Sequence, residues 1–130
     1  MRCNTNNFYG AQAEQFSFYR IPKALFTEPN FRELSTDAKV LYGILLDRMS
    51  LSLKNQWLDA QNKVYIIFTV EEIMDALNCA NQKATRLMVE LEKQAGLIER
   101  KRQGLGRPNL IYVKNFAATI NDKSCEKGDS

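Results

Sequence analysis

Residues 69–96 read TVEEIMDALNCANQKATRLMVELEKQAG, and this stretch decides the fold. Thr69 and Glu72 have the Thr-x-x-Glu spacing of a capping box, which predicts the start of a short helix over residues 70–77. The next three residues, Asn-Cys-Ala at 78–80, predict a tight turn. The segment therefore begins with a short helix that stops abruptly.

A second helix is expected over residues 82–94, with Asn81 as its N-cap and Gly96 as the residue that ends it. On a helical wheel its small and apolar side chains gather on one side, which predicts the side that faces the core. These side chains are Ala84, Leu87, Met88, Leu91 and Ala95. The opposite side is polar and cationic. A short helix, a tight turn and a second helix of this kind are typical of a helix-turn-helix.

Residues 99–115, ERKRQGLGRPNLIYVKN, follow directly and predict a two-stranded hairpin. Strands are expected over residues 97–102 and 110–114, because the glycines and the proline between them permit a tight bend and resist ladder pairing. A hairpin directly after the second helix gives the winged variant of the helix-turn-helix. The predicted fold class is therefore α+β, a winged helix-turn-helix domain with a C-terminal two-stranded wing.

Three more elements are predicted upstream of the helix-turn-helix. Ser35-Thr36-Asp37 offers capping oxygens before AKVLYGILLDRMS (38–50). A helix over these residues is apolar nearly all round and is therefore expected at the centre of the fold. Short strands are expected over residues 18–21 and 64–68, where aromatic and β-branched side chains are concentrated.

The winged-helix domain is expected to span residues 16–116, between a polar N-terminal arm (1–15) and a polar linker or tail (117–130). Seven of the thirteen aromatic residues lie in the first quarter of the chain: Phe8, Tyr9, Phe16, Phe18, Tyr19, Phe26 and Phe31. They pack either in the core of this domain or against a second copy of it. The second interpretation predicts a homodimer formed through residues 8–31.

Positive charge is concentrated in the same region as the helix-turn-helix and the hairpin. Residues 81–116 contain eight Lys or Arg against three Glu, a net charge of +5, whereas the whole chain carries +3. A basic segment on an otherwise slightly acidic chain is typical of an electrostatic docking surface, with double-stranded DNA as the expected partner. The alternative is an ordinary solvated run of charges.

The predicted DNA contacts fall into two groups. In the second helix, the recognition helix, the side chains expected to reach bases or phosphates are Asn81, Gln82, Lys83, Thr85, Arg86 and Lys93. In the wing, those expected beside the duplex backbone or in the minor groove are Arg100, Arg102, Gln103, Arg107, Asn109 and Lys114. For Lys83 and Arg86 the alternative is helix solubilisation, and Glu90, one turn after Arg86, is spaced to pair with it.

Composition argues against an enzyme. The chain has no histidine, which removes Ser-His and Cys-His nucleophiles and His-based acid–base chemistry. It also lacks the glycine-rich phosphate-binding motifs. Its cysteines, Cys3, Cys79 and Cys125, are scattered, which favours reduced thiols in a cytoplasm over a zinc site. We therefore expect no catalytic residue, no metal and no cofactor. No apolar run is long enough for a membrane span.

Four stretches carry a resemblance to a known family. They are FYRIPKALF (18–26), LSTDAKVLYGILLDRMS (34–50), NQWLDAQNKVYIIFTVEEIMDALNC (55–79) and RQGLGRPNLIYVKNF (102–116). Together they resemble the N-terminal domain of the RepA-type replication initiators of theta-replicating plasmids from low-GC Gram-positive bacteria. The resemblance runs from about residue 16 to residue 116, and the wing is its most distinctive part.

The resemblance implies a winged-helix domain that binds repeated sites (iterons) in a plasmid origin as a homodimer. In that family a linker and a C-terminal domain normally follow, and host replication proteins are expected to be recruited there. Two other functions compete: a winged-helix transcription regulator, and a protein-interaction winged helix whose cations meet an acidic partner. A nicking initiator typically needs a His-coordinated metal, which a chain without histidine does not offer.

Overall fold

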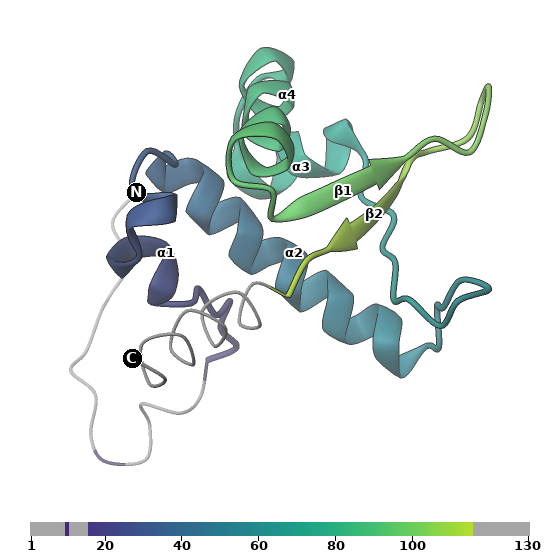
Figure 1. Cartoon of the computed structure of the whole chain (residues 1–130), viewed down its shortest axis with the longest axis horizontal. Coiled ribbons are helices and arrows are strands. Elements are labelled where there is room, and N and C mark those ends of the chain that lie inside the picture. Colours follow the sequence, from purple (N-terminus) through teal and green to yellow (C-terminus); the bar gives the residue numbers. More distant parts are fainter. Residues whose placement is uncertain (1–9, 11–15, 116–130) are drawn as a thin grey trace, which may run out of the picture.

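The longest helix, α2 (Thr36–Lys54), runs through the centre of the fold, and the other elements gather around it (Figure 1). The computed structural model describes residue 10 and residues 16–115. In chain order the elements are α1 (Ala24–Thr27), η2 (Pro29–Phe31), α2, α3 (Val70–Leu77), α4 (Asn81–Val89), η3 (Glu90–Gln94), β1 (Ile98–Lys101) and β2 (Leu110–Val113).

Helix α2 begins as its sequence predicts and extends further. The Ser35 hydroxyl oxygen accepts a hydrogen bond from the Ala38 amide at 3.2 Å, which satisfies one of the free N–H groups of the first turn. Buried residues lie on several sides of the helix, among them Leu41, Tyr42 and Ile44, which confirms the expected central position. The helix continues four residues past the predicted end at 50.

No helix in the described part of the chain has the length and hydropathy of a membrane span.

The helix-turn-helix forms where the capping box predicts it. The Glu72 amide donates to the Thr69 hydroxyl at 3.2 Å, and the Glu72 carboxylate accepts from the Thr69 amide at 3.1 Å. Helix α3 ends at Asn78, whose φ of 52° is left-handed, a conformation that asparagine tolerates. The expected cap at Asn81 is wrong. Ala80 has the extended backbone of the N-cap, and Asn81 is already the first helical residue.

The recognition helix consists of α4 and the π-helical turn η3 rather than one regular helix over residues 82–94. The five-residue step is made by the Ala95 amide, which donates to the Glu90 carbonyl at 3.0 Å. The predicted core side is confirmed: four of its side chains are buried and the fifth, Ala95, is partly buried. Gly96 has a φ of 65° and ends the helix as expected.

The wing is an antiparallel pair in which Ile98 faces Val113 and Lys101 faces Leu110. A third segment joins it at one point only. The amides of Ile66 and Ile111 each donate to the other's carbonyl at 2.9 Å. The predicted strand over 64–68 is therefore reduced to single bridges. Val64 pairs with Leu58 in the preceding loop, and helix α3 begins too soon after Ile66 for a ladder to grow.

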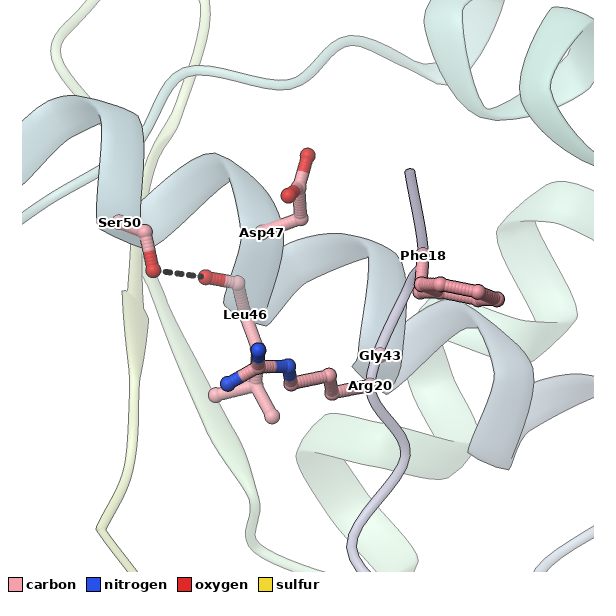
Figure 2. Close-up of a pocket in the computed structure, with 6 residues that line it drawn as sticks. All are labelled: Phe18, Arg20, Gly43, Leu46, Asp47 and Ser50. Atoms are coloured by element: carbon pink, nitrogen blue, oxygen red, sulfur yellow. Dashed lines mark hydrogen bonds between the residues drawn. The ribbon is translucent and has the colours of Figure 1, made fainter. Parts of the chain in front are cut away.

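The predicted strand over residues 18–21 is absent. This segment is extended, but it crosses α2 at Gly43, as Figure 2 shows, and a helix offers no ladder partner. The crossing is so close that a Cβ on Gly43 would lie 2.8 Å from Ile21 Cγ1 and 3.1 Å from the Arg20 carbonyl oxygen. Glycine is required here because it has no side chain.

The N-terminal aromatic residues were expected either in the core of this domain or against a second copy of it, and the structure contains both buried and exposed ones. Phe31 is buried in the core at 7% exposure. The exposed aromatics of this segment are Phe16, Phe18, Tyr19 and Phe26, at 52, 64, 58 and 52%. Phe8 and Tyr9 lie outside the described residues. The ring of Phe26 lies under Lys39 Nζ of α2, 4.5 Å from its centroid, so packing within the domain accounts for Phe31 and for part of Phe26.

Candidate nucleic-acid interface

The polar side of the recognition helix is open to solvent. Asn81, Gln82, Thr85, Arg86 and Lys93 are all exposed. The suggested pairing of Arg86 with Glu90 does not form. Glu90 instead accepts hydrogen bonds from the Ser35 amide at 2.9 Å and the Ser35 hydroxyl at 3.0 Å. Within residues 16–115, no carboxylate lies within ion-pair distance of Arg86. Its guanidinium is left facing water.

Lys83 differs from its neighbours because its charge has a partner. Its Nζ lies 2.6 Å from the Asp37 carboxylate in the first turn of α2, with the two side chains 41% and 51% exposed. The sequence predicts Asp37 only as a capping group. Its contact with Lys83 joins elements far apart in the chain, and no local pattern indicates it.

Arg100 is also paired, and it connects the wing to the recognition helix. Its Nε and one terminal nitrogen donate to a Glu92 carboxylate oxygen at 3.0 and 2.7 Å, with side chains 26% and 19% exposed. The hydrogen bond from Arg100 lowers the pKa of Glu92 below its ordinary value. The sequence does not predict a role for Glu92, because it is one of several carboxylates in the same helix. The pair links β1 to η3.

The rest of the wing presents its predicted residues to solvent. Arg102, Gln103, Arg107 and Asn109 are exposed, and Lys114 lies 3.5 Å from Glu99. The Gln103 side-chain amide donates to the Pro108 carbonyl at 2.8 Å, which ties the two arms of the loop. On the recognition helix and the wing together, five cations have no ion pair among the residues described: Arg86, Lys93, Lys101, Arg102 and Arg107.

A side-chain contact that the sequence did not indicate supports the base of the wing. The Tyr112 hydroxyl donates to Asp59 at 3.0 Å, and the other Asp59 oxygen accepts from the amides of Gln61 and Lys63. The amide of Lys63 is the main cause of the lowered pKa of Asp59. Burial, and then the Asp59 contact, raise the pKa of Tyr112. The loop after α2 thus holds the return strand of the wing.

A helix-turn-helix followed by a cationic two-stranded wing defines the winged-helix class of DNA-binding domain. Residues 17–127 match the family model described as the replication initiator protein A (RepA) N-terminus. The chain therefore belongs to that family, and the expected family resemblance is confirmed.

Solved structures with the same fold are similar to it throughout. One, described as the N-terminal domain of a DNA binding protein, is 35% identical with a TM-score of 0.71, covering 97% of this chain and 98% of that one. A second, described as a Rep–DNA complex, is 35% identical with a TM-score of 0.71, covering 96% and 98%. A third, described as an MDR initiator, is 38% identical with a TM-score of 0.66, covering 92% and 98%.

A curated relative is the 41 kDa protein of Lactobacillus helveticus, 32% identical over 103 residues. The match covers 79% of this chain but only 28% of that protein. The chain thus spans less than a third of the length of this relative.

Proposed function

We propose that this domain binds double-stranded DNA at repeated sites in a plasmid origin, and that it acts by binding rather than by catalysis. The proposal rests on one observation above all. Five exposed cations without an ion pair among the described residues lie together on the recognition helix and the wing, the two elements with which a winged helix meets a duplex. Membership of an initiator family supports the origin as the target.

The proposed contacts fall into two groups, those that reach the bases and those that reach the phosphate backbone. Asn81, Gln82, Thr85 and Arg86, on the first turns of α4, face the base edges, where Arg reads guanine and Gln reads adenine. Lys93 and the wing residues Arg102, Gln103, Arg107 and Asn109 contact the backbone and fix the position of the domain. Lys83, Arg100 and Lys114 already have carboxylate partners, so their contribution to DNA binding requires an exchange of partner.

The binding test begins with a selection from a randomised duplex pool, which defines the preferred site. The affinity for that duplex and for a scrambled one is then measured across a range of salt concentrations. If the five unpaired cations each neutralise one phosphate, log K falls against log salt with a slope of about −4.5. A slope near zero, or equal affinity for acidic peptides and DNA, contradicts the proposal and favours a protein partner.

Base reading is tested at Arg86, which is exposed and has no ion pair among the described residues. Arg86→Ala is expected to lose about 1–3 kcal/mol on the selected duplex and much less on the scrambled one. Arg86→Lys is the matched variant, since it keeps the charge but loses the bidentate fork. It should behave like the alanine variant on the selected duplex. Equal losses on both duplexes would make Arg86 a backbone contact.

The wider activity of the protein is part of the same proposal. We infer that two copies associate through residues 8–31, since four aromatic side chains of the described part of this segment are exposed. A C-terminal domain following this one would meet the host replication proteins. Action on plasmid DNA places the protein in the bacterial cytoplasm.

A further inference from the structure

Leu105, at the tip of the wing, is fully exposed. Its relative exposure is 105%, against 64% for Phe18, the next most exposed large apolar side chain of the described residues. Figure 1 shows the hairpin loop extending beyond the ends of β1 and β2, away from the helices. A leucine in this position makes no contribution to the core, and its whole side chain is available to a partner.

The backbone around Leu105 is built to hold it outward. Gly104 and Gly106 have φ of 120° and 77°, conformations that side chains rarely permit. The Arg107 amide donates to the Gly104 carbonyl at 3.3 Å, which closes the turn around Leu105. Below it, the bond from Gln103 to the Pro108 carbonyl joins the two arms. A closed, glycine-flanked turn therefore presents one apolar side chain beyond the rest of the wing.

The charges beside this leucine indicate the chemistry of its partner. Lys101, Arg102 and Arg107 are exposed on the same loop and strand end, and no ion pair holds them within residues 16–115. An apolar tip among cations suits a polyanion that also offers an apolar surface. The minor groove of DNA is such a surface, with deoxyribose walls between two rows of phosphates, and apolar side chains are known to enter it.

We propose that Leu105 inserts into the minor groove beside the site where α4 docks, and packs against the deoxyribose walls. This inference rests on the proposed DNA-binding function and adds to it a non-ionic contact at the wing tip. Arg102 and Arg107 hold the flanking phosphates, and the leucine fills the groove between them. Burying its isobutyl group there removes apolar surface from water, which favours the docked wing.

The test separates an apolar contact from an ionic one. Leu105→Ala is expected to weaken binding to the selected duplex on the order of tenfold, because it removes apolar surface that the docked wing buries only in part. The slope of log K against log salt should not change, since no counterion is released by leucine. Arg107→Ala is the matched comparison and should reduce the slope by about 0.9. Leu105→Met, which keeps an apolar side chain of similar size, should bind like the wild type.

Hydroxyl-radical footprinting locates the contact, because the radical attacks deoxyribose in the minor groove. The wild type should protect sugars that flank the α4 site, and Leu105→Ala should lose that protection. Thermal unfolding checks that the free variant keeps its stability. Unchanged affinity and footprint for Leu105→Ala, or a lower salt slope in that variant, would overturn this inference while leaving the proposed function intact. Failure of the wild type to bind any duplex would overturn the proposed function itself.

Discussion

Asp37 and Lys83 form an ion pair at the edge of the predicted recognition surface. At the scale of single residues, this pair determines how much of the positive charge of α4 is available to a phosphate. Asp37→Asn removes the competing carboxylate and is expected to raise affinity for duplexes of any sequence. The slope of log K against log salt should become more negative by about 0.9, the value for one added phosphate contact.

Asp47→Asn is the matched control for this substitution. Asp47 is an exposed carboxylate on the same helix, ten residues further along and therefore about 15 Å away. It should change the salt slope much less. If Asp37→Asn instead weakens binding to the selected duplex, the pair serves to orient Lys83 rather than to occupy its charge.

At the scale of elements, the pair of Glu92 and Arg100 joins the wing to η3 and gives that junction a pH dependence. The hydrogen bond from Arg100 lowers the pKa of Glu92 in the folded state. Ionised Glu92 therefore stabilises the fold at pH values above the ordinary carboxyl pKa of 4.5, and this contribution is lost as the pH falls through the folded-state pKa. Urea unfolding between pH 3 and pH 7 should show it.

Glu92→Gln should reduce the acid-dependent loss of unfolding free energy without abolishing it. Asp59 also has a lowered pKa and contributes in the same direction. Glu71→Gln removes an exposed carboxylate that has no ion pair in the described part of the chain, and it should leave the pH profile close to that of the wild type. A profile for Glu92→Gln identical to the wild type would show that the pair adds nothing to stability.

Gly43 governs a second junction between elements, where the segment before α1 crosses α2. Gly→Ala in a helix normally stabilises by about 0.5–1 kcal/mol. Here the added Cβ would meet Ile21 at 2.8 Å, so Gly43→Ala is expected to destabilise by about 1–3 kcal/mol in chemical unfolding. Combining it with Ile21→Ala should recover part of the loss. A simple stabilisation would mean that the crossing segment moves aside freely.

Local signals predicted the long helices and the wing, whereas contacts between distant segments were not predictable. The capping box of Thr69 and Glu72 acts within four residues, so the start of α3 could be read directly. The strand expected over 18–21 has the right composition, but its neighbour turned out to be α2 at Gly43. Among the candidate DNA contacts, exposure followed from helical and strand periodicity. The partners of Lys83 and Arg100 did not, because Asp37 and Glu92 approach through the tertiary fold.

At the scale of the whole molecule, the exposed aromatics before α2 predict association of two copies. Phe18 borders a hollow of about 360 Å³ over α2, together with Arg20, Asp47 and Ser50 (Figure 2). Tyr19, its neighbour, is 58% exposed. Two large aromatic side chains exposed side by side in the chain are of the kind that a partner surface covers. Sedimentation at tens of micromolar should give a dimer for the wild type and a monomer for the double variant Phe18→Ser, Tyr19→Ser.

Leu53→Ser is the control for that experiment, because Leu53 is as exposed as Tyr19 (59%) but lies near the far end of α2. It should remain a dimer. A wild type that sediments as a monomer, or a double variant that stays dimeric, would remove the N-terminal segment as the interface. The affinity for a single binding site should change little in the double variant, since α4 and the wing are untouched.

The two hydrogen bonds between Ile66 and Ile111 have a consequence for the order in which the domain assembles during synthesis. The ribosome releases α3 and α4 before β2. The helix-turn-helix therefore leaves the exit tunnel before the strand that hydrogen-bonds to Ile66, in the segment that leads into α3. Until Ile111 arrives, the amide and the carbonyl of Ile66 lack the backbone partners that they have in the finished domain. A nascent chain stopped before β2 therefore carries the complete recognition helix, but the segment that leads into α3 is not yet joined to the wing.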